Sequence, residues 1–142
     1  MKKDVVISIR GISEIDNERD DIEMTTLGNF QYRNGKYYLS YRESDMTGME
    51  GTVTTLEVDG QRQVIMNRRG TSRSQLIIEN GKRHICQYGL EYGGVTLGVS
   101  SQKIRNDLSI NGGRLTFKYT LDINSELAST NEVHIKVEEC KK

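Results

Sequence analysis

The chain has 142 residues, the usual size of a single domain with one hydrophobic core, and we expect one domain over residues 1–142. Twenty basic residues balance twenty acidic ones, so no net charge draws the protein to nucleic acid or to an anionic membrane. The only two cysteines, Cys86 and Cys140, exclude a disulfide framework and a four-cysteine zinc site, and we expect both to be free thiols.

The first apolar stretch of the chain runs from Val5 to Ile9. It is too short for the hydrophobic region of a signal peptide or for a membrane span. The sequence therefore predicts a cytoplasmic protein that does not enter a membrane.

Runs rich in β-branched and aromatic residues alternate with glycine-containing turns along the whole chain. In chain order, the pattern predicts ten strands, over residues 4–11, 22–33, 36–44, 50–58, 61–69, 73–79, 82–88, 94–101, 113–124 and 130–139. Three dipeptides between these strands, Asn34-Gly35, Asp59-Gly60 and Asn80-Gly81, predict hairpins with type I′ turns. The fold class is therefore all-β, an antiparallel meander.

The segments between the strands are less regular. The acidic stretch from Asp16 to Asp21 and the segment from Asn124 to Ser129 are predicted to be loops. Residues 104–110 fit either one helical turn or an extension of the preceding strand. A meander of this length leaves two exposed sheet edges unless it closes, so the pattern favours a barrel.

Motifs of familiar enzymes are absent from the sequence. There is no glycine-rich phosphate loop, no His-Glu-x-x-His and no Gly-x-Ser-x-Gly. We therefore expect no cofactor and assign no catalytic residue.

Strand alternation brings several polar residues into phase with apolar ones, so that both share one face of a strand. If these faces point inward, the polar residues form a cluster around one end of the barrel interior. The predicted cluster consists of Arg68, Glu43, His84, Tyr41, Tyr88 and Ser74.

Four interpretations of this cluster remain open. Glu43 and Arg68 could form a structural ion pair, because a buried charge needs a partner. Arg68 could instead hold a small polar or anionic ligand. Glu43 or His84 could act as a general acid or base. His84 and Cys86 could supply two ligands to a metal ion, but two ligands do not make a metal site, and we predict none.

Basic residues interleave with tyrosines along the predicted strands from residue 32 to 83. This pattern could indicate a surface for single-stranded nucleic acid, but the zero net charge and the lack of an RNA-recognition motif favour a solvated outer face. We do not expect nucleic acid as a partner.

Short motifs spread along most of the chain resemble the YwiB-like family of bacterial calycin-type β-barrel proteins, a domain-of-unknown-function family. They are Leu27-Gly28-x-Phe30, Gly35-x-Tyr37-Tyr38-Leu39-x-Tyr41-x-Glu43, Gly51-x-x-Thr54-Thr55-Leu56, Arg68-x-Gly70, Ser74-x-Leu76, Gly81-x-x-His84-x-x-x-Tyr88, Gly112-Gly113-x-Leu115-x-x-x-Tyr119-x-Leu121 and Ser129-x-Asn131. The resemblance implies a closed, calycin or lipocalin-like barrel in a bacterial cytoplasm. It implies no established activity.

The leading hypothesis is a non-enzymatic barrel that binds a small molecule in its lumen through the predicted cluster. The second is a protein-interaction or structural module with a packed interior, acting through an outer strand or as a homodimer. The third is a small enzyme that uses Glu43 or His84.

Overall fold

The computed structural model describes residues 2–44, 50–70, 73–90 and 93–140, with only the backbone described at 87–90 and 93–95. Within these ranges the chain forms ten strands, as predicted, and no helix that could cross a membrane. The strands are β1 (Lys3–Ile15), β2 (Glu18–Arg33), β3 (Lys36–Arg42), β4 (Val53–Asp59), β5 (Gln63–Arg69), β6 (Arg73–Glu79), β7 (Arg83–Leu90), β8 (Gly93–Ser109), β9 (Gly112–Ile123) and β10 (Glu126–Glu139).

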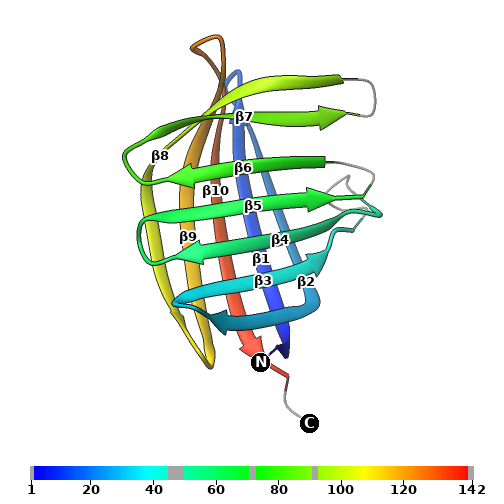
Figure 1. Cartoon of the computed structure of the whole chain (residues 1–142). Helices are drawn as coiled ribbons and strands as arrows, with labels where there is room; N and C mark the ends of the chain where they lie inside the picture. Colours follow the sequence, from blue (N-terminus) through cyan, green and yellow to red (C-terminus); the bar gives the residue numbers. More distant parts are fainter. Residues whose placement is uncertain (1, 45–49, 71–72, 91–92, 141–142) are drawn as a thin grey trace.

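The strands close into a barrel, which confirms the predicted fold class. Each strand pairs antiparallel with its neighbours in the sequence, and β1 closes the barrel by pairing with β10, from Val5↔Glu139 to Glu14↔Thr130. The shorter strands β3 to β7 run across the longer strands β1, β9 and β10 (Figure 1). The barrel therefore has two layers whose strands cross.

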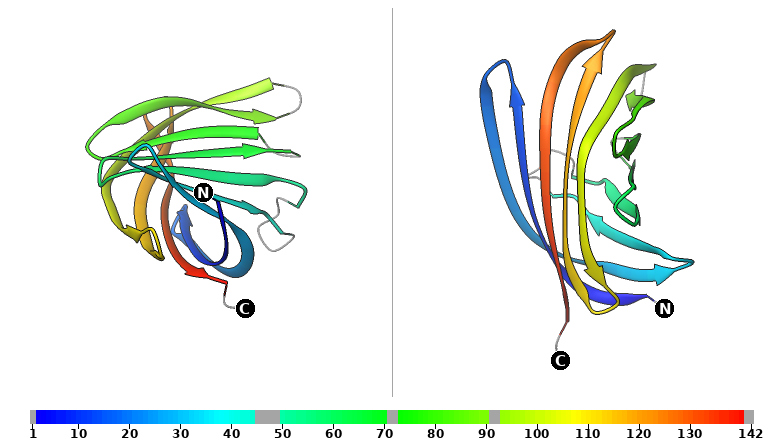
Figure 2. Two further views of the ribbon diagram at one scale, coloured as in Figure 1. Left: turned by 60° about the horizontal axis from the view of Figure 1, so that its bottom comes forward. Right: turned by 90° about the vertical axis from the view of Figure 1, so that its left-hand side faces the viewer.

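Two long strands, β2 and β8, connect the two layers. β2 pairs with β1 over residues 18–30 and with β3 only over residues 28–33. β8 pairs with β7 over residues 93–100 and with β9 over residues 98–109, with an irregularity between Ser100 and Lys103. Both strands curve as they pass from one layer to the other (Figure 2).

The turns only partly have the predicted geometry. Asn34 and Gly35 both have positive φ, as a type I′ turn requires. At the other two predicted turns only the glycine, Gly60 or Gly81, has positive φ. The type I′ prediction was therefore wrong at these two hairpins, where the Arg62 and Lys82 N–H groups donate to the Asp59 and Glu79 carbonyl groups.

The structure also corrects the predicted loops. The stretch from Asp16 to Asp21 is a turn only at Asp16 and Asn17, which have φ of 51° and 67°, and β2 already begins at Glu18. Its charged residues can lie in a strand because they pair with β1 and point into solvent. The second predicted loop shrinks to a turn at Asn124 and Ser125, and residues 104–109 belong to β8.

Apolar side chains from every strand pack together inside the barrel. Fully burying a valine, leucine, isoleucine, phenylalanine or methionine side chain contributes about 1.5–3 kcal/mol to stability. Among the largest that are fully buried are Phe30, Phe117, Ile7, Leu39, Leu56 and Leu76.

The seam between β6 and β7 is the least regular part of the wall. Register pairs join the two strands only at Arg73↔Gly89 and Ser74↔Tyr88. Nearer the hairpin, the Ile77 N–H group donates to the Cys86 Sγ atom at 3.4 Å. Cys86 is buried and Cys140 exposed, and both are free thiols, as predicted.

Candidate functional site

Five adjacent strands place one residue each on the same rung of the sheet. The register pairs are Tyr41↔Thr54, Thr54↔Arg68, Arg68↔Ser74 and Ser74↔Tyr88. We call Tyr41, Thr54, Arg68 and Ser74, together with the nearby Glu43, the inner row. It lies where β3, β5 and β7 end, at the right of Figure 1.

The inner row faces the barrel interior, because its members alternate in phase with core residues. Tyr41 follows Leu39 on β3, Arg68 follows Met66 on β5, and both of these core residues are buried. The sequence predicted this orientation for Tyr41, Glu43, Arg68 and Ser74, and the structure brings these four residues together.

Glu43 contributes a buried carboxylate, whose side chain is only 2% exposed. The Thr54 hydroxyl donates a hydrogen bond to the Glu43 Oε2 atom. The Arg68 Nε atom lies 3.9 Å from the same oxygen, within ion-pair range but too far for a hydrogen bond. The Glu43 backbone N–H donates to the Thr52 carbonyl at 2.8 Å, which fixes the end of β3.

Tyr41 lies beside this carboxylate and is itself buried. Burial, with the negative charge of Glu43 as a second cause, raises the pKa of Tyr41 well above its ordinary value. The phenol therefore stays protonated at neutral pH, with hydrogen bonds to the Glu43 and Thr54 side chains.

Two polar atoms of the inner row are buried without a hydrogen-bond partner in the described part of the chain. They are the Arg68 Nε atom and the Ser74 Oγ atom. Because Arg68 and Ser74 are cross-strand neighbours, the two donors belong to one small region. A buried polar group without a partner costs about 1–3 kcal/mol, so two adjacent ones call for an explanation.

His84 does not join the inner row, and its predicted place in the cluster was wrong. Its Nε2 atom lies 2.9 Å from the Glu79 Oε1 atom, near the β6–β7 hairpin. Glu79 is five residues from Ser74 along β6, a separation of about 17 Å. His84 therefore lies towards the opposite end of these strands from Arg68.

Tyr88 is on the rung of the inner row through its backbone pairing with Ser74. Its side chain lies outside the described part of the structure, so its predicted role in the cluster stays a prediction.

The His84 and Cys86 side chains have separate partners, Glu79 and the Ile77 N–H group. In the described part of the chain, no group of three or more histidine, cysteine, aspartate or glutamate side chains is arranged to hold a metal ion.

The sequence analysis missed Thr54 and Glu79. Thr54 is fully buried and hydrogen-bonds the Glu43 carboxylate. Its position two residues before Leu56, in the same phase, was the available signal. Glu79 receives hydrogen bonds from His84 and Lys82, and the His84 hydrogen bond is the largest cause that lowers the pKa of the Glu79 carboxyl.

The tyrosines near the basic residues of β2 and β3 have intramolecular partners. The Tyr37 ring stacks on Phe30 with centroids 5.6 Å apart, and the Arg33 guanidinium lies over the Tyr38 ring. These contacts account for the aromatic residues without a nucleic-acid partner.

The fold and the inner row define a class: an all-β, ten-stranded antiparallel barrel with a polar cluster at one end of its interior. The chain belongs to the family described as a domain of unknown function (DUF1934), which matches residues 7–135. This membership confirms the resemblance found in the sequence.

The chain is also similar to an individual relative, the uncharacterized β-barrel protein YwiB of Bacillus subtilis (strain 168). The two are 24% identical over 134 residues, which cover 94% of this chain and 92% of the relative. The crystal structure of ywiB protein from Bacillus subtilis matches with a TM-score of 0.85 and 23% identity, over 99% of this chain and 94% of that one. The structural likeness shows the fold and carries no activity with it.

Proposed function

We propose that this protein is a non-enzymatic, cytoplasmic binding protein that holds a small polar molecule at the inner row. The observation that carries the proposal is the pair of buried donors, Arg68 Nε and Ser74 Oγ, for which the described residues supply no hydrogen-bond partner. A bound acceptor group that reaches both atoms would remove two desolvation penalties at once.

The charges of the inner row indicate the class of ligand. Arg68 is the cation and Glu43 the anion, but their closest atoms are 3.9 Å apart, so the guanidinium keeps hydrogen-bonding capacity. A carboxylate fits the Arg68 guanidinium and the neighbouring Ser74 hydroxyl. The proposed ligand is therefore a small carboxylic acid.

A second candidate, an interaction module, is favoured by a different observation. Apolar side chains fill the described interior, while others are exposed at the neighbouring tips of the β1–β2 and β9–β10 hairpins. These are Ile15, Ile123 and Leu127, with exposures of 51%, 43% and 67%. A protein partner or a second copy of the chain would cover them.

An enzyme ranks third. A reaction shared between Glu43 and His84 finds no support in the geometry, because the two side chains lie towards opposite ends of the strands.

Native mass spectrometry tests the binding proposal. Protein purified without denaturant from the organism that produces it is weighed intact and after denaturation, and we expect a departing small molecule. Ser74→Ala should remove that adduct, because it deletes one donor. It should leave stability unchanged or increased, because a buried unsatisfied hydroxyl is lost.

Two neighbouring arginines on β5 give a matched pair of variants, with Arg68→Met as the test and Arg69→Met as the control. Arg69 is exposed and points outward, so its substitution should leave the adduct in place. Arg68→Met should remove the adduct, but it also leaves the Glu43 carboxylate without its cation and so lowers stability. Protein without any adduct, or an adduct that survives Ser74→Ala, would refute the proposal and favour the interaction module.

A further inference from the structure

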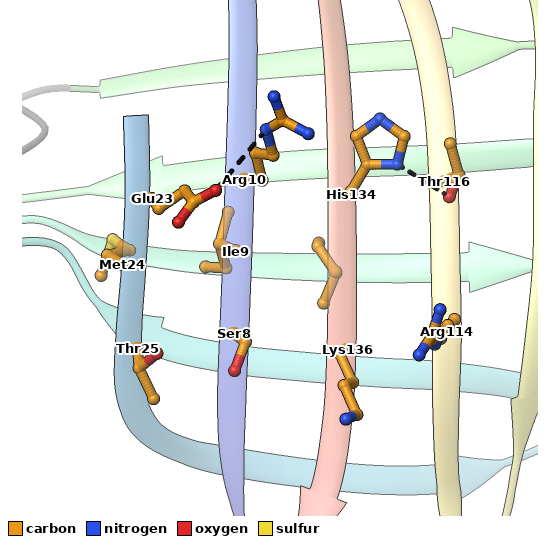
Figure 3. A pocket seen from close by; sticks show the side chains of 11 residues that line it. Ser8, Ile9, Arg10, Glu23, Met24, Thr25, Arg114, Thr116, His134 and Lys136 are labelled. Atoms are coloured by element: carbon orange, nitrogen blue, oxygen red, sulfur yellow. Dashed lines mark hydrogen bonds and ion pairs between the residues drawn. The ribbon is translucent and has the colours of Figure 1, made fainter. Parts of the chain in front are cut away.

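The outer face of the long-strand layer carries a groove of about 340 Å³, whose lining includes no residue of the inner row. Figure 3 shows its lining side chains, which come from β2, β1, β10 and β9. Two neighbouring rungs line it. The first is Glu23, Arg10, His134 and Thr116, and the second is Thr25, Ser8, Lys136 and Arg114.

The register places like charges opposite one another in the second rung. Lys136 pairs with Arg114 across β10 and β9. Like charges directly opposite on one face of a sheet are destabilising. Such a pair is a local conflict of the kind that marks functional sites.

Carboxylates lie near three of the four basic residues of the groove. Arg10 makes two hydrogen bonds to Asp21, at 3.1 and 2.6 Å, and lies 3.7 Å from Glu23, which also lines the groove. Lys136 lies 2.6 Å from Glu138, and His134 lies 3.4 Å from Glu132. The fourth basic residue, Arg114, has no carboxylate partner among the described residues.

Arg114 differs from the other three basic residues. Among the described residues, no ion pair or hydrogen bond involves its side chain, which is exposed. Asp107 is its register partner on β8, but that carboxylate pairs with Arg105 at 2.9 Å. The Arg114 guanidinium therefore has its donors free for an anion.

Hydroxyl groups line the same groove. Ser8 and Thr25 face each other across β1 and β2, and no hydrogen bond to another described residue uses either hydroxyl as a donor. Thr116 lies 3.4 Å from the His134 Nδ1 atom. These short side chains leave room for an anion between the longer basic side chains, and their hydroxyl groups can donate hydrogen bonds to it.

We propose that this outer groove binds a phosphate group, either free phosphate or the phosphate of a small monoester. A phosphate carries about 1.5 to 2 negative charges at neutral pH and three strong acceptor oxygens, which match the Arg114 guanidinium, the Lys136 ammonium beside it and the hydroxyls of Ser8 and Thr25. The groove volume is within the range of about 300–1,000 Å³ that is usual for small-molecule sites. This site is independent of the inner row and of the carboxylic acid proposed there.

Nuclear magnetic resonance titration of the ¹⁵N-labelled full chain tests the site, with inorganic phosphate and glycerol 3-phosphate as probes and chloride as the control anion. We expect saturable shifts at Ser8, Thr25, Arg114, Thr116 and Lys136 and none at the inner row. Tighter binding of the ester would identify a phosphorylated small molecule, and equal binding would identify free phosphate. Equal saturation by chloride would overturn the proposal.

Arg114→Gln gives the decisive arm of the test. It should weaken phosphate binding about tenfold or more, the usual loss for a charge-assisted hydrogen bond. It should also raise the thermal midpoint of the free protein, because it removes one like-charge pair. A structural role for Arg114 would lower that midpoint.

Arg69→Gln is the matched control, because Arg69 is an exposed arginine on β5 and lies outside the groove. It should leave phosphate binding unchanged. Ser74→Ala should also bind phosphate as the wild type does, which separates this site from the inner row. Phosphate affinity that is the same in Arg114→Gln and in the wild type would overturn the proposal.

Discussion

Gly28 in β2 determines how closely β3 approaches at the start of the inner row. It pairs with Tyr41, and a Cβ atom there would lie 2.5 Å from the Ser40 carbonyl oxygen and 2.5 Å from the Ile7 Cδ1 atom. The first contact is with backbone, which cannot swing away as a side chain can. A bare backbone at residue 28 is therefore needed to keep Tyr41 in register.

We expect Gly28→Ala to lower the free energy of unfolding by about 1–3 kcal/mol, the usual cost of overpacking. Gly11→Ala on the neighbouring strand is the control, because a Cβ there meets nothing within 4 Å. That change should be neutral or slightly stabilising, since alanine restricts the unfolded chain. Urea unfolding measures both variants, and equal losses would contradict the role of Gly28.

Among the elements, the β6–β7 hairpin is held by charged groups more than by a ladder of backbone hydrogen bonds. Glu79 lies 2.9 Å from His84 and 3.3 Å from Lys82. The His84 hydrogen bond is the main cause that holds the pKa of Glu79 below its ordinary value of about 4.5. A lowered carboxyl pKa stabilises the folded state above the unfolded pKa, and that contribution is lost as the pH falls through the folded value.

The hairpin should therefore loosen below about pH 4.5. We expect Glu79→Gln to be less stable than the wild type at pH 7 and to lose less of its stability between pH 5 and pH 3. Urea midpoints across this pH range measure the effect. Glu139→Gln is the control, because Glu139 forms an exposed ion pair with Lys3. If the urea midpoint of Glu139→Gln fell as little between pH 5 and pH 3 as that of Glu79→Gln, Glu79 would have no special role.

The elements also show how far the sequence could lead. Alternation and Asn-Gly turns were enough to find the strands, because each buries one face. Strand alternation also correctly predicted an inward orientation for four side chains, those of Tyr41, Glu43, Arg68 and Ser74. Phase alone does not say which rungs align, since that depends on turn length, strand bends and bulges such as the one at Ser100.

His84 illustrates this limit. It lies three residues after Gly81 of the hairpin turn, whereas Ser74 lies five residues before Glu79, at the other end of β6. Equal phase therefore placed them on one face but near different ends. Counting from the turn would have separated them. The outer groove could not be predicted in this way, because its rungs depend on the register between β1 and β10, which lie at opposite ends of the chain.

Across the whole molecule, the pairing of β1 with β10 makes both layers depend on one closed core. Ile7 of β1 is fully buried and pairs with Val137 of β10, at the closing seam. Its side chain also packs with residues from the shorter strands in a single cluster. A destabilising substitution at this seam should therefore also destabilise strands that do not pair with β1 or β10.

We expect Ile7→Ala to cost about 2–5 kcal/mol and to shift every probe of unfolding together. Four of the seven tyrosines, residues 32, 37, 38 and 41, lie on β2 and β3, so tyrosine fluorescence mainly reports that region, while far-ultraviolet circular dichroism reports all strands. Both midpoints should fall equally in urea. Ile15→Ala, half exposed at the tip of the same strand, should change stability by about 0.5 kcal/mol or less. Separate transitions for the two probes would mean that the layers unfold independently and that closure by β1 and β10 does not couple them.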